Sequence, residues 1–145
     1  KRDGSLINFD LSNKRNLQDM ILVTSKNHRN QTLKNLIQKI NFKEVVVMGS
    51  IGCKIASIVR GESDIYICLS KPGKSSPKDW DFAAPEAILK AAGGAITNLD
   101  NEALLYGSAN FEQGGIIVAS NDISNHERIC SEIKEIVKKY DIYPL

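Results

Sequence analysis

The sequence has little aromatic character, little net charge and no long hydrophobic run. Aromatic residues make up 6% of the 145 residues, and the formal net charge is +2. Such a small charge gives no strong attraction to a nucleic acid polymer or to an anionic membrane surface. No apolar run approaches the ~20 residues that a membrane span needs, and no secretory signal is visible. We therefore expect no nucleic acid partner and no membrane partner.

Cysteine and histidine are also scarce. Cys53, Cys68 and Cys130 are odd in number, widely spaced and without a metal-ligand pattern. Each stands among apolar neighbours, so we expect small buried residues in a reducing cytoplasm. No Ser-His-Asp or Cys-His set indicates a nucleophile. His126, on the last predicted helix, is expected at the surface.

What is present is an ordinary globular composition, with 42% hydrophobic and 25% charged residues. The length predicts one domain that buries about two-thirds of its unfolded surface. The chain opens on Lys1 without a methionine, which is a weak hint that it is a piece of something longer.

Short apolar runs alternate with amphipathic segments along the chain. Strands are predicted at 20–25, 44–48, 64–69, 95–98 and 114–119, with short candidates at 6–11 and 104–106. Helices are predicted at 30–40, 53–59, 81–92 and from about 122 onward. The strands read as buried on both sides, which predicts an α/β fold with a mixed, mostly parallel sheet flanked by helices on both faces. Ligands in such folds bind at the carboxyl ends of strands.

The stretch from Lys78 to Gly94 predicts one well-delimited helix. Asp81 can cap its N-terminus, and Gly93 can adopt the left-handed conformation that ends it. Residues 82–92 are mostly small or apolar, so we expect a buried helix. Taken alone, Asp81 is more often a cap than a metal ligand, and Trp80 is more often a core anchor than the wall of a pocket.

Two polar clusters follow predicted strands. In the first, residues 49–54, glycines free backbone N–H groups at a helix N-terminus, while Ser50 adds a hydroxyl and Lys54 a charge, all suited to an anion. The alternative is an ordinary turn with a solvated lysine. In the second, His28 follows Ser25, and it either contacts a phosphate or base or is a surface histidine.

A third group of charges lies in the loop before Trp80. Lys71, Lys74 and Lys78 could attract an anionic substrate, although such loops are usually only solvated. Asp81 and Glu86 are the carboxylates placed to bind a metal, and one carboxylate does not build a Mg²⁺ site for phosphoryl transfer.

The segment from Trp80 to Gly94 resembles the long, specific C-terminal signature of the inositol monophosphatase superfamily. That signature runs W-D-x-A-A/P, then a helix, then a glycine pair. Further matches, to the 3'(2'),5'-bisphosphate nucleotidase branch, extend along nearly the whole chain. They are the S-x-x-H pattern in 23–28, the glycine-rich turn at 49–54, the helix and strand at 58–66, Ala84-Pro85-Glu86 and the strand at 117–121.

The resemblance implies a Mg²⁺-dependent phosphatase that removes the 3'-phosphate of adenosine 3',5'-bisphosphate, or of its 5'-phosphosulfate analogue, in sulfur assimilation. It implies no catalytic residue within this lobe. It implies Asp81 as a metal ligand, Ser25 and His28 at the nucleotide phosphate, and Gly49, Ser50 and Lys54 at phosphate or ribose.

One departure from the family pattern matters. The glutamate pair and the D-P-x-D-G-T segment, which carry the family's other metal ligands, do not occur here. Residues 1–145 therefore resemble the C-terminal lobe alone, with the N-terminal lobe of the same protein as a partner and little turnover in isolation. Two alternative functions stay open: an inositol or sugar phosphatase, and a non-catalytic binding module. A second copy in a homodimer also stays open as a further partner.

Overall fold

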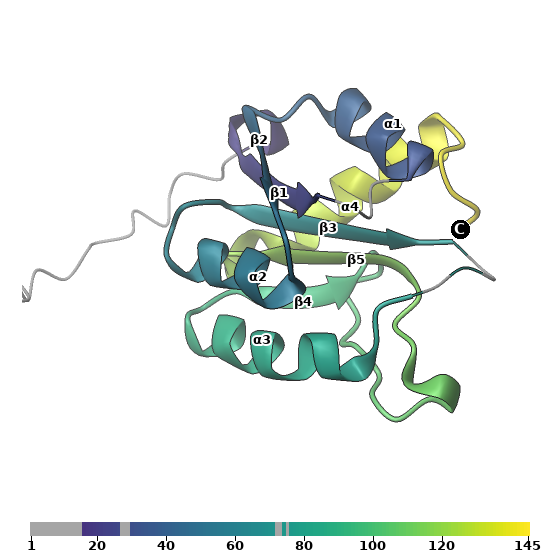
Figure 1. The fold of residues 1–145 in the computed structure, drawn as a ribbon. Helices are drawn as coiled ribbons and strands as arrows, with labels where there is room; N and C mark the ends of the chain where they lie inside the picture. Colours follow the sequence, from purple (N-terminus) through teal and green to yellow (C-terminus); the bar gives the residue numbers. More distant parts are fainter. Residues whose placement is uncertain (1–15, 27–29, 72–73, 75) are drawn as a thin grey trace, which may run out of the picture.

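A computed structural model describes residues 16–26, 30–71, 74 and 76–145. The candidate strand at 6–11 and His28 lie outside the described residues. A five-stranded sheet forms the middle of three layers, with α1 and α4 on one face and α2 and α3 on the other (Figure 1). This arrangement confirms the predicted α/β class.

The elements follow one another much as the hydrophobic periodicity predicts. The strands are β1 (Ile21–Ser25), β2 (Glu44–Met48), β3 (Ile65–Ser70), β4 (Ala95–Asn98) and β5 (Gly115–Ser120). The helices are α1 (Gln31–Ile40), α2 (Ile51–Val59), α3 (Asp79–Ala91) and α4 (Ile123–Lys139), with short 3-10 turns at Leu17–Asp19 and Ala109–Phe111. The candidate strand at 104–106 does not form, and only an isolated bridge from Thr97 to Ala103 marks its position.

The strand order is β2-β1-β3-β5-β4. β1 pairs in parallel with both β2 and β3, whereas β5 runs antiparallel to its neighbours β3 and β4. All strands except β5 therefore share one direction, as a mixed, mostly parallel sheet requires. The carboxyl ends of β1, β2 and β3 consequently meet at one edge.

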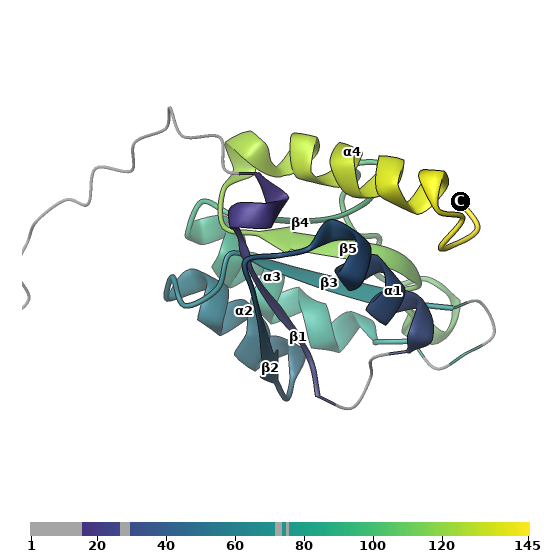
Figure 2. The ribbon, with the colours of Figure 1, turned by 90° about the horizontal axis from the view of Figure 1, so that it is seen from above.

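Alternate residues of the central strands supply two separate cores. Ile65, Ile67 and Leu69 of β3 join the cluster on the α1/α4 face, while Tyr66 and Cys68 face α2 and α3. Figure 2 looks onto the face that α1 and α4 cover, with α2 and α3 behind the sheet. The period of two along the strand explains this division. Because Tyr66 and Cys68 lie on the α2/α3 side, polar atoms reach the layer that carries the candidate site.

The prediction that 44–48 is buried on both sides is wrong. β2 is an edge strand, with Val45 and Val47 exposed by 39% and 42%. A run of β-branched residues favours a strand but does not fix its place in the sheet.

The prediction of a buried α3 is also wrong in part. Phe82, Glu86 and Leu89 point inward, but Ile88 is 57% exposed and Trp80 is 67% exposed. Trp80 is therefore no core anchor. The predicted end of the helix is confirmed, because Gly93 takes φ +89°. None of the helices within the described ranges is long and apolar enough to cross a membrane.

Candidate functional site

A cavity of about 860 Å³ opens where the carboxyl ends of β1 and β2 meet the N-terminal ends of α2 and α3. Its lining draws on both polar clusters that follow predicted strands and on the charged loop before Trp80. Its described lining includes Ser25, Gly49, Ser50, Lys54 and Asp81, and so every described residue of the predicted site. The roles of these residues stay predictions.

Lys54 is the least expected member of this lining. Its side chain is only 2% exposed, so the solvated-lysine interpretation is wrong. Its Nζ donates to the carbonyl of Gly49 at 2.8 Å and lies 5.0 Å from the ring centre of Tyr66. Burial lowers the pKa of Lys54 from its usual value, because desolvation disfavours the charged form. An anion in the cavity would restore part of the lost solvation.

Ser50 begins α2 as its N-cap, with its Oγ accepting the N–H of Cys53 at 3.1 Å. The first N–H groups of any helix have no acceptor within the helix. Here they are at the cavity's edge, and the positive end of the helix dipole favours a negative ligand there. The Ser50 side chain thus caps the helix, while the backbone N–H groups of the turn are placed to bind a phosphate.

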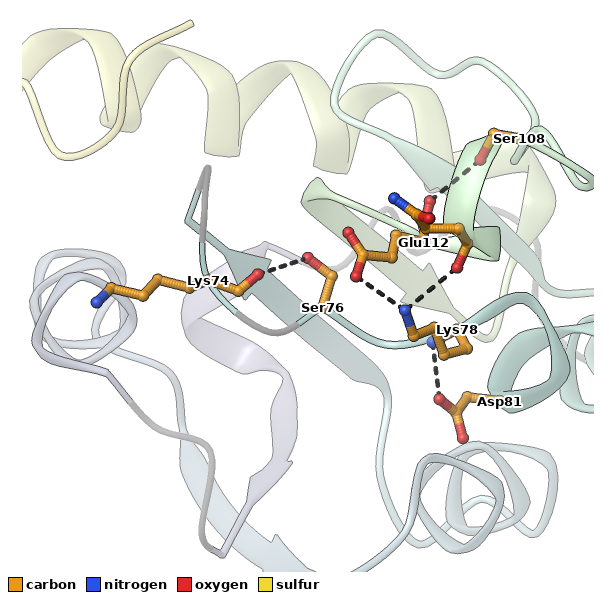
Figure 3. A network of polar contacts seen from close by, with 7 residues as sticks. Lys74, Ser76, Lys78, Asp81, Ser108 and Glu112 are labelled. Atoms are coloured by element: carbon orange, nitrogen blue, oxygen red, sulfur yellow. Dashed lines mark hydrogen bonds and ion pairs between the residues drawn. The ribbon is translucent and has the colours of Figure 1, made fainter.

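Asp81 lies in the first turn of α3 rather than at its cap position, which Lys78 occupies. One carboxylate oxygen, Oδ2, accepts the Lys78 backbone N–H at 2.8 Å, and the second oxygen points away from this bond (Figure 3). Asp81 is therefore both a helix-capping group and a half-buried carboxylate on the cavity wall. The two interpretations that the sequence set against each other are compatible.

Sequence reasoning missed the floor of the cavity, formed by Tyr66 and Cys68. Burial raises the pKa of both side chains, so phenol and thiol stay protonated. The alternation of polar Tyr66, Cys68 and Ser70 along β3 was the available signal, because these residues share one face of the strand.

Lysines around the cavity make it electropositive. Lys26, Lys71 and Lys74 line it together with Lys54. Lys78 is excluded from this group, since its Nζ pairs with Glu112 at 2.8 Å. The cavity thus combines several cationic groups with one carboxylate, a balance that suits a multiply charged anion.

The described residues of the cavity could supply one carboxylate ligand for a Mg²⁺ ion, Asp81, and do not form a complete site. Asp81 is the one carboxylate among the described lining residues, and no group of at least three His, Cys, Asp or Glu side chains within the described ranges could hold a metal ion. A Mg²⁺ ion takes six oxygen ligands in near-octahedral geometry. The remaining ligands would have to come from substrate, water or other polypeptide.

Two predictions about isolated residues are wrong. His126 is 1% exposed, and it is buried between Ser120 and Thr97 rather than lying on the surface. All three cysteines are free, but Cys53 is exposed and Cys68 half-buried, so only Cys130 matches the expectation of burial. The available signal for His126 was its spacing, because it lies three and seven residues before Ile129 and Ile133 and so shares the buried stripe of α4.

Comparison with known proteins identifies the family. The sequence matches the inositol monophosphatase family over residues 3–138. The chain belongs to this family. A mouse relative, 3'(2'),5'-bisphosphate nucleotidase 1, is 33% identical over 120 residues, and the match covers 81% of this chain and 37% of the relative.

Two further matches agree with this family member's fold and branch. The 3'(2'),5'-bisphosphate nucleotidase CysQ of Buchnera aphidicola is 40% identical over 76 residues, which are 52% of this chain and 26% of the relative. An inositol monophosphatase II of Staphylococcus aureus superimposes with a TM-score of 0.64 at 23% identity, over 90% of this chain and 46% of that one. The matches therefore span about a quarter to a half of the length of these proteins.

Proposed function

We propose that this chain is the C-terminal lobe of a phosphatase that removes the 3'-phosphate of adenosine 3',5'-bisphosphate or of its 5'-phosphosulfate analogue. One observation carries the proposal. A single cavity gathers Lys54 and the N-terminal end of α2 opposite Asp81, in a member of the inositol monophosphatase family. The nucleotidases among its relatives support the choice of substrate class.

Within this chain, the proposed roles are binding and orientation. The turn at Gly49 and Ser50 would receive a phosphate on backbone N–H groups, and Lys54 would place a positive charge beside it. Ser25 at the end of β1 would donate to a second phosphate or to the ribose, as would His28. Lys71 and Lys74 would raise the local concentration of the anionic nucleotide.

The proposed metal is Mg²⁺, for which Asp81 would supply one ligand. When bound, Mg²⁺ would neutralise charge on the phosphoryl oxygens and lower the pKa of a bound water. The capping bond from the Lys78 N–H holds the Asp81 carboxylate in place. The other carboxylates would come from an N-terminal lobe, so this lobe contains no catalytic residue and has little turnover alone.

The proposed partner is that N-terminal lobe, and α3 offers it a surface. The outer side of α3 exposes Trp80, Ile88 and a row of alanines, and the exposed Leu105 and Phe111 come from the neighbouring connection. The Trp80 and Phe111 rings lie 6.2 Å apart between centroids and so join the two segments in one apolar surface, which marks an interaction site. Because the chain matches 37% of the mouse nucleotidase, the rest of such a fold is the occupant we propose. The free cysteines suit the proposed cytoplasmic location, and a role in sulfur assimilation would follow from the substrate.

Calorimetric titration of the chain tests the substrate class. Adenosine 3',5'-bisphosphate should bind at least about tenfold more tightly than inositol 1-phosphate, since a second phosphate adds charged hydrogen bonds. Tighter binding of the inositol ester would favour an inositol phosphatase instead. If neither ester binds, the assignment of the cavity as a phosphate ester site is contradicted.

A phosphate-release assay tests the division between lobes. The chain alone should release no phosphate from the bisphosphate in Mg²⁺, and Mg²⁺-dependent turnover would exclude the non-catalytic, isolated binding module. In a polypeptide carrying both lobes, Asp81→Asn should lower activity by about tenfold or more at ordinary Mg²⁺. Unchanged activity would remove Asp81 from the metal site.

A further inference from the structure

The connection between β4 and β5, residues 99–114, folds back over the start of α3. Residues 77–80, which immediately precede Asp81, each contact this connection. Gln113 N–H donates to the Pro77 carbonyl at 2.8 Å, and the Lys78 Nζ donates to the Asn110 carbonyl at 3.2 Å and pairs with Glu112 at 2.8 Å. Figure 3 shows Lys78 between Glu112 and Asp81.

Asp79 and Gln113 are the buried centre of these contacts. Asp79 is 8% exposed and Gln113 6% exposed. The Gln113 Nε2 donates to Asp79 Oδ1 at 2.6 Å and to the Leu105 carbonyl at 2.7 Å, while the Gly107 N–H donates to Asp79 Oδ2 at 2.6 Å. Loss of the Gln113 amide would leave Oδ1 of this buried carboxylate without its donor, although the Gly107 N–H would still bind Oδ2. A buried charge that is only partly hydrogen-bonded is destabilising, so this loss would drive Asp79 toward solvent.

The connection also needs α3 in return. Asn110 and Phe111 both have positive φ, 64° and 54°, a conformation that a bulky residue adopts only when its surroundings hold it there. The Phe111 ring lies 6.2 Å from the Trp80 ring, between centroids. Helix start and connection therefore fix each other.

We infer that Gln113 is a positioning residue, which fixes the first turn of α3 through Asp79 and so holds the Asp81 carboxylate at the wall of the cavity. Asp81 is held through its neighbour, because its Oδ2 accepts the Lys78 N–H at 2.8 Å. Movement of the Asp79 turn would carry Asp81 with it, because the two residues share one turn. The inference rests on the proposed function only in the experiment that measures binding of a phosphate ester.

A double-mutant cycle between Asp81 and Gln113 tests this coupling. The probe is adenosine 3',5'-bisphosphate, titrated calorimetrically in EDTA so that no metal takes part. In the wild-type background, Asp81→Asn should tighten binding about fivefold, because it removes a like charge that faces the anion. In the Gln113→Met background, the same change should alter binding by less than about twofold. Equal tightening in both backgrounds would overturn the inference, since a merely structural role leaves the two effects additive.

Trp80, the only tryptophan, gives a second readout that needs no ligand. Time-resolved anisotropy should show a larger fast local component in Gln113→Met, because the first turn of α3 is released. Gln18→Met is the matched control, since its Nε2 also donates to a carbonyl, that of Ile40 at 3.2 Å, in the α1/α4 layer away from the cavity. Unchanged Trp80 motion in Gln113→Met would overturn the inference even if the bisphosphate did not bind.

Should Gln113→Met fail to fold, Gln113→Asn replaces it in both measurements. Its amide is one methylene shorter and cannot reach Asp79 and the Leu105 carbonyl together. If the wild-type protein does not bind the bisphosphate, the proposed function alone is contradicted. If the Asp81 and Gln113 effects are additive, or if Trp80 motion is unchanged in the Gln113 variant, the positioning role is contradicted.

Discussion

At the scale of single residues, His126 shows how burial fixes a protonation state. The Thr97 hydroxyl donates to the Asn98 carbonyl at 2.7 Å, so Thr97 Oγ1 accepts from the His126 Nε2–H at 2.8 Å. Nδ1 is then free to accept from the Ser120 hydroxyl at 2.6 Å. Every partner suits the neutral ring, and burial lowers the pKa of His126 to about 4.

This depressed pKa predicts a loss of stability in acid. Unfolded His126 binds a proton near pH 6.5, whereas the folded protein resists it until about pH 4. The stabilisation is therefore complete above pH 6.5 and declines as the pH falls toward 4, by up to about 3 kcal/mol. Urea unfolding of wild type and His126→Gln between pH 4 and 8 measures it. Parallel pH profiles for the two proteins would show that His126 does not titrate on unfolding.

Lys54 carries the corresponding prediction for the cavity. Lys54→Met should weaken binding of adenosine 3',5'-bisphosphate by about tenfold, the value of one hydrogen bond to a charged group. The free energy of unfolding should change little, because an apolar side chain of similar length replaces a desolvated charge. Wild-type affinity should also fall as the pH rises through the lowered pKa of Lys54. Lys34→Met, at an exposed position of α1, is the control, and equal losses in both variants would refute a specific role.

At the scale of elements, periodicity and end signals predict where helices and strands begin and end, but not where each element lies in the fold. Ser50 and Asn30 begin helices, and Gly93 ends one, because these residues satisfy or relax the backbone locally. The position of β2 at the sheet edge depends on strand order, which no local pattern encodes. For the same reason, no local pattern predicts that the β4–β5 connection contacts the start of α3.

The turn from α3 to β4 yields a prediction about packing. A Cβ on Gly94 would lie 2.4 Å from the Ser120 carbonyl oxygen and 2.6 Å from a Leu89 methyl. Gly94→Ala should therefore lower stability by roughly 1–3 kcal/mol, because backbone must move. Gly52→Ala within α2 is the matched control: its nearest contact would be 3.9 Å away, and it should stabilise slightly. Thermal unfolding compares them, and equal midpoints would contradict the packing argument.

At the scale of the whole molecule, topology assembles the candidate site. Ser25, Lys54 and Asp81 are far apart in sequence, yet each follows a strand whose carboxyl end reaches the same sheet edge. This much could be predicted, because parallel strands place their following loops together. The burial of Lys54 could not be predicted, since it depends on how α2 packs against β3.

The exposed side of α3 gives the last prediction. If a second lobe packs against this surface in the whole protein, the isolated chain should bind hydrophobic dyes and self-associate through the same surface. Ile88→Glu should reduce both effects, measured by dye fluorescence and sedimentation velocity, without lowering the unfolding midpoint. Ile123→Glu is the matched control, because Ile123 is 66% exposed against 57% for Ile88 but begins α4 on the opposite layer. Equal reduction by both variants would mean that general hydrophobicity, rather than the α3 surface, drives association.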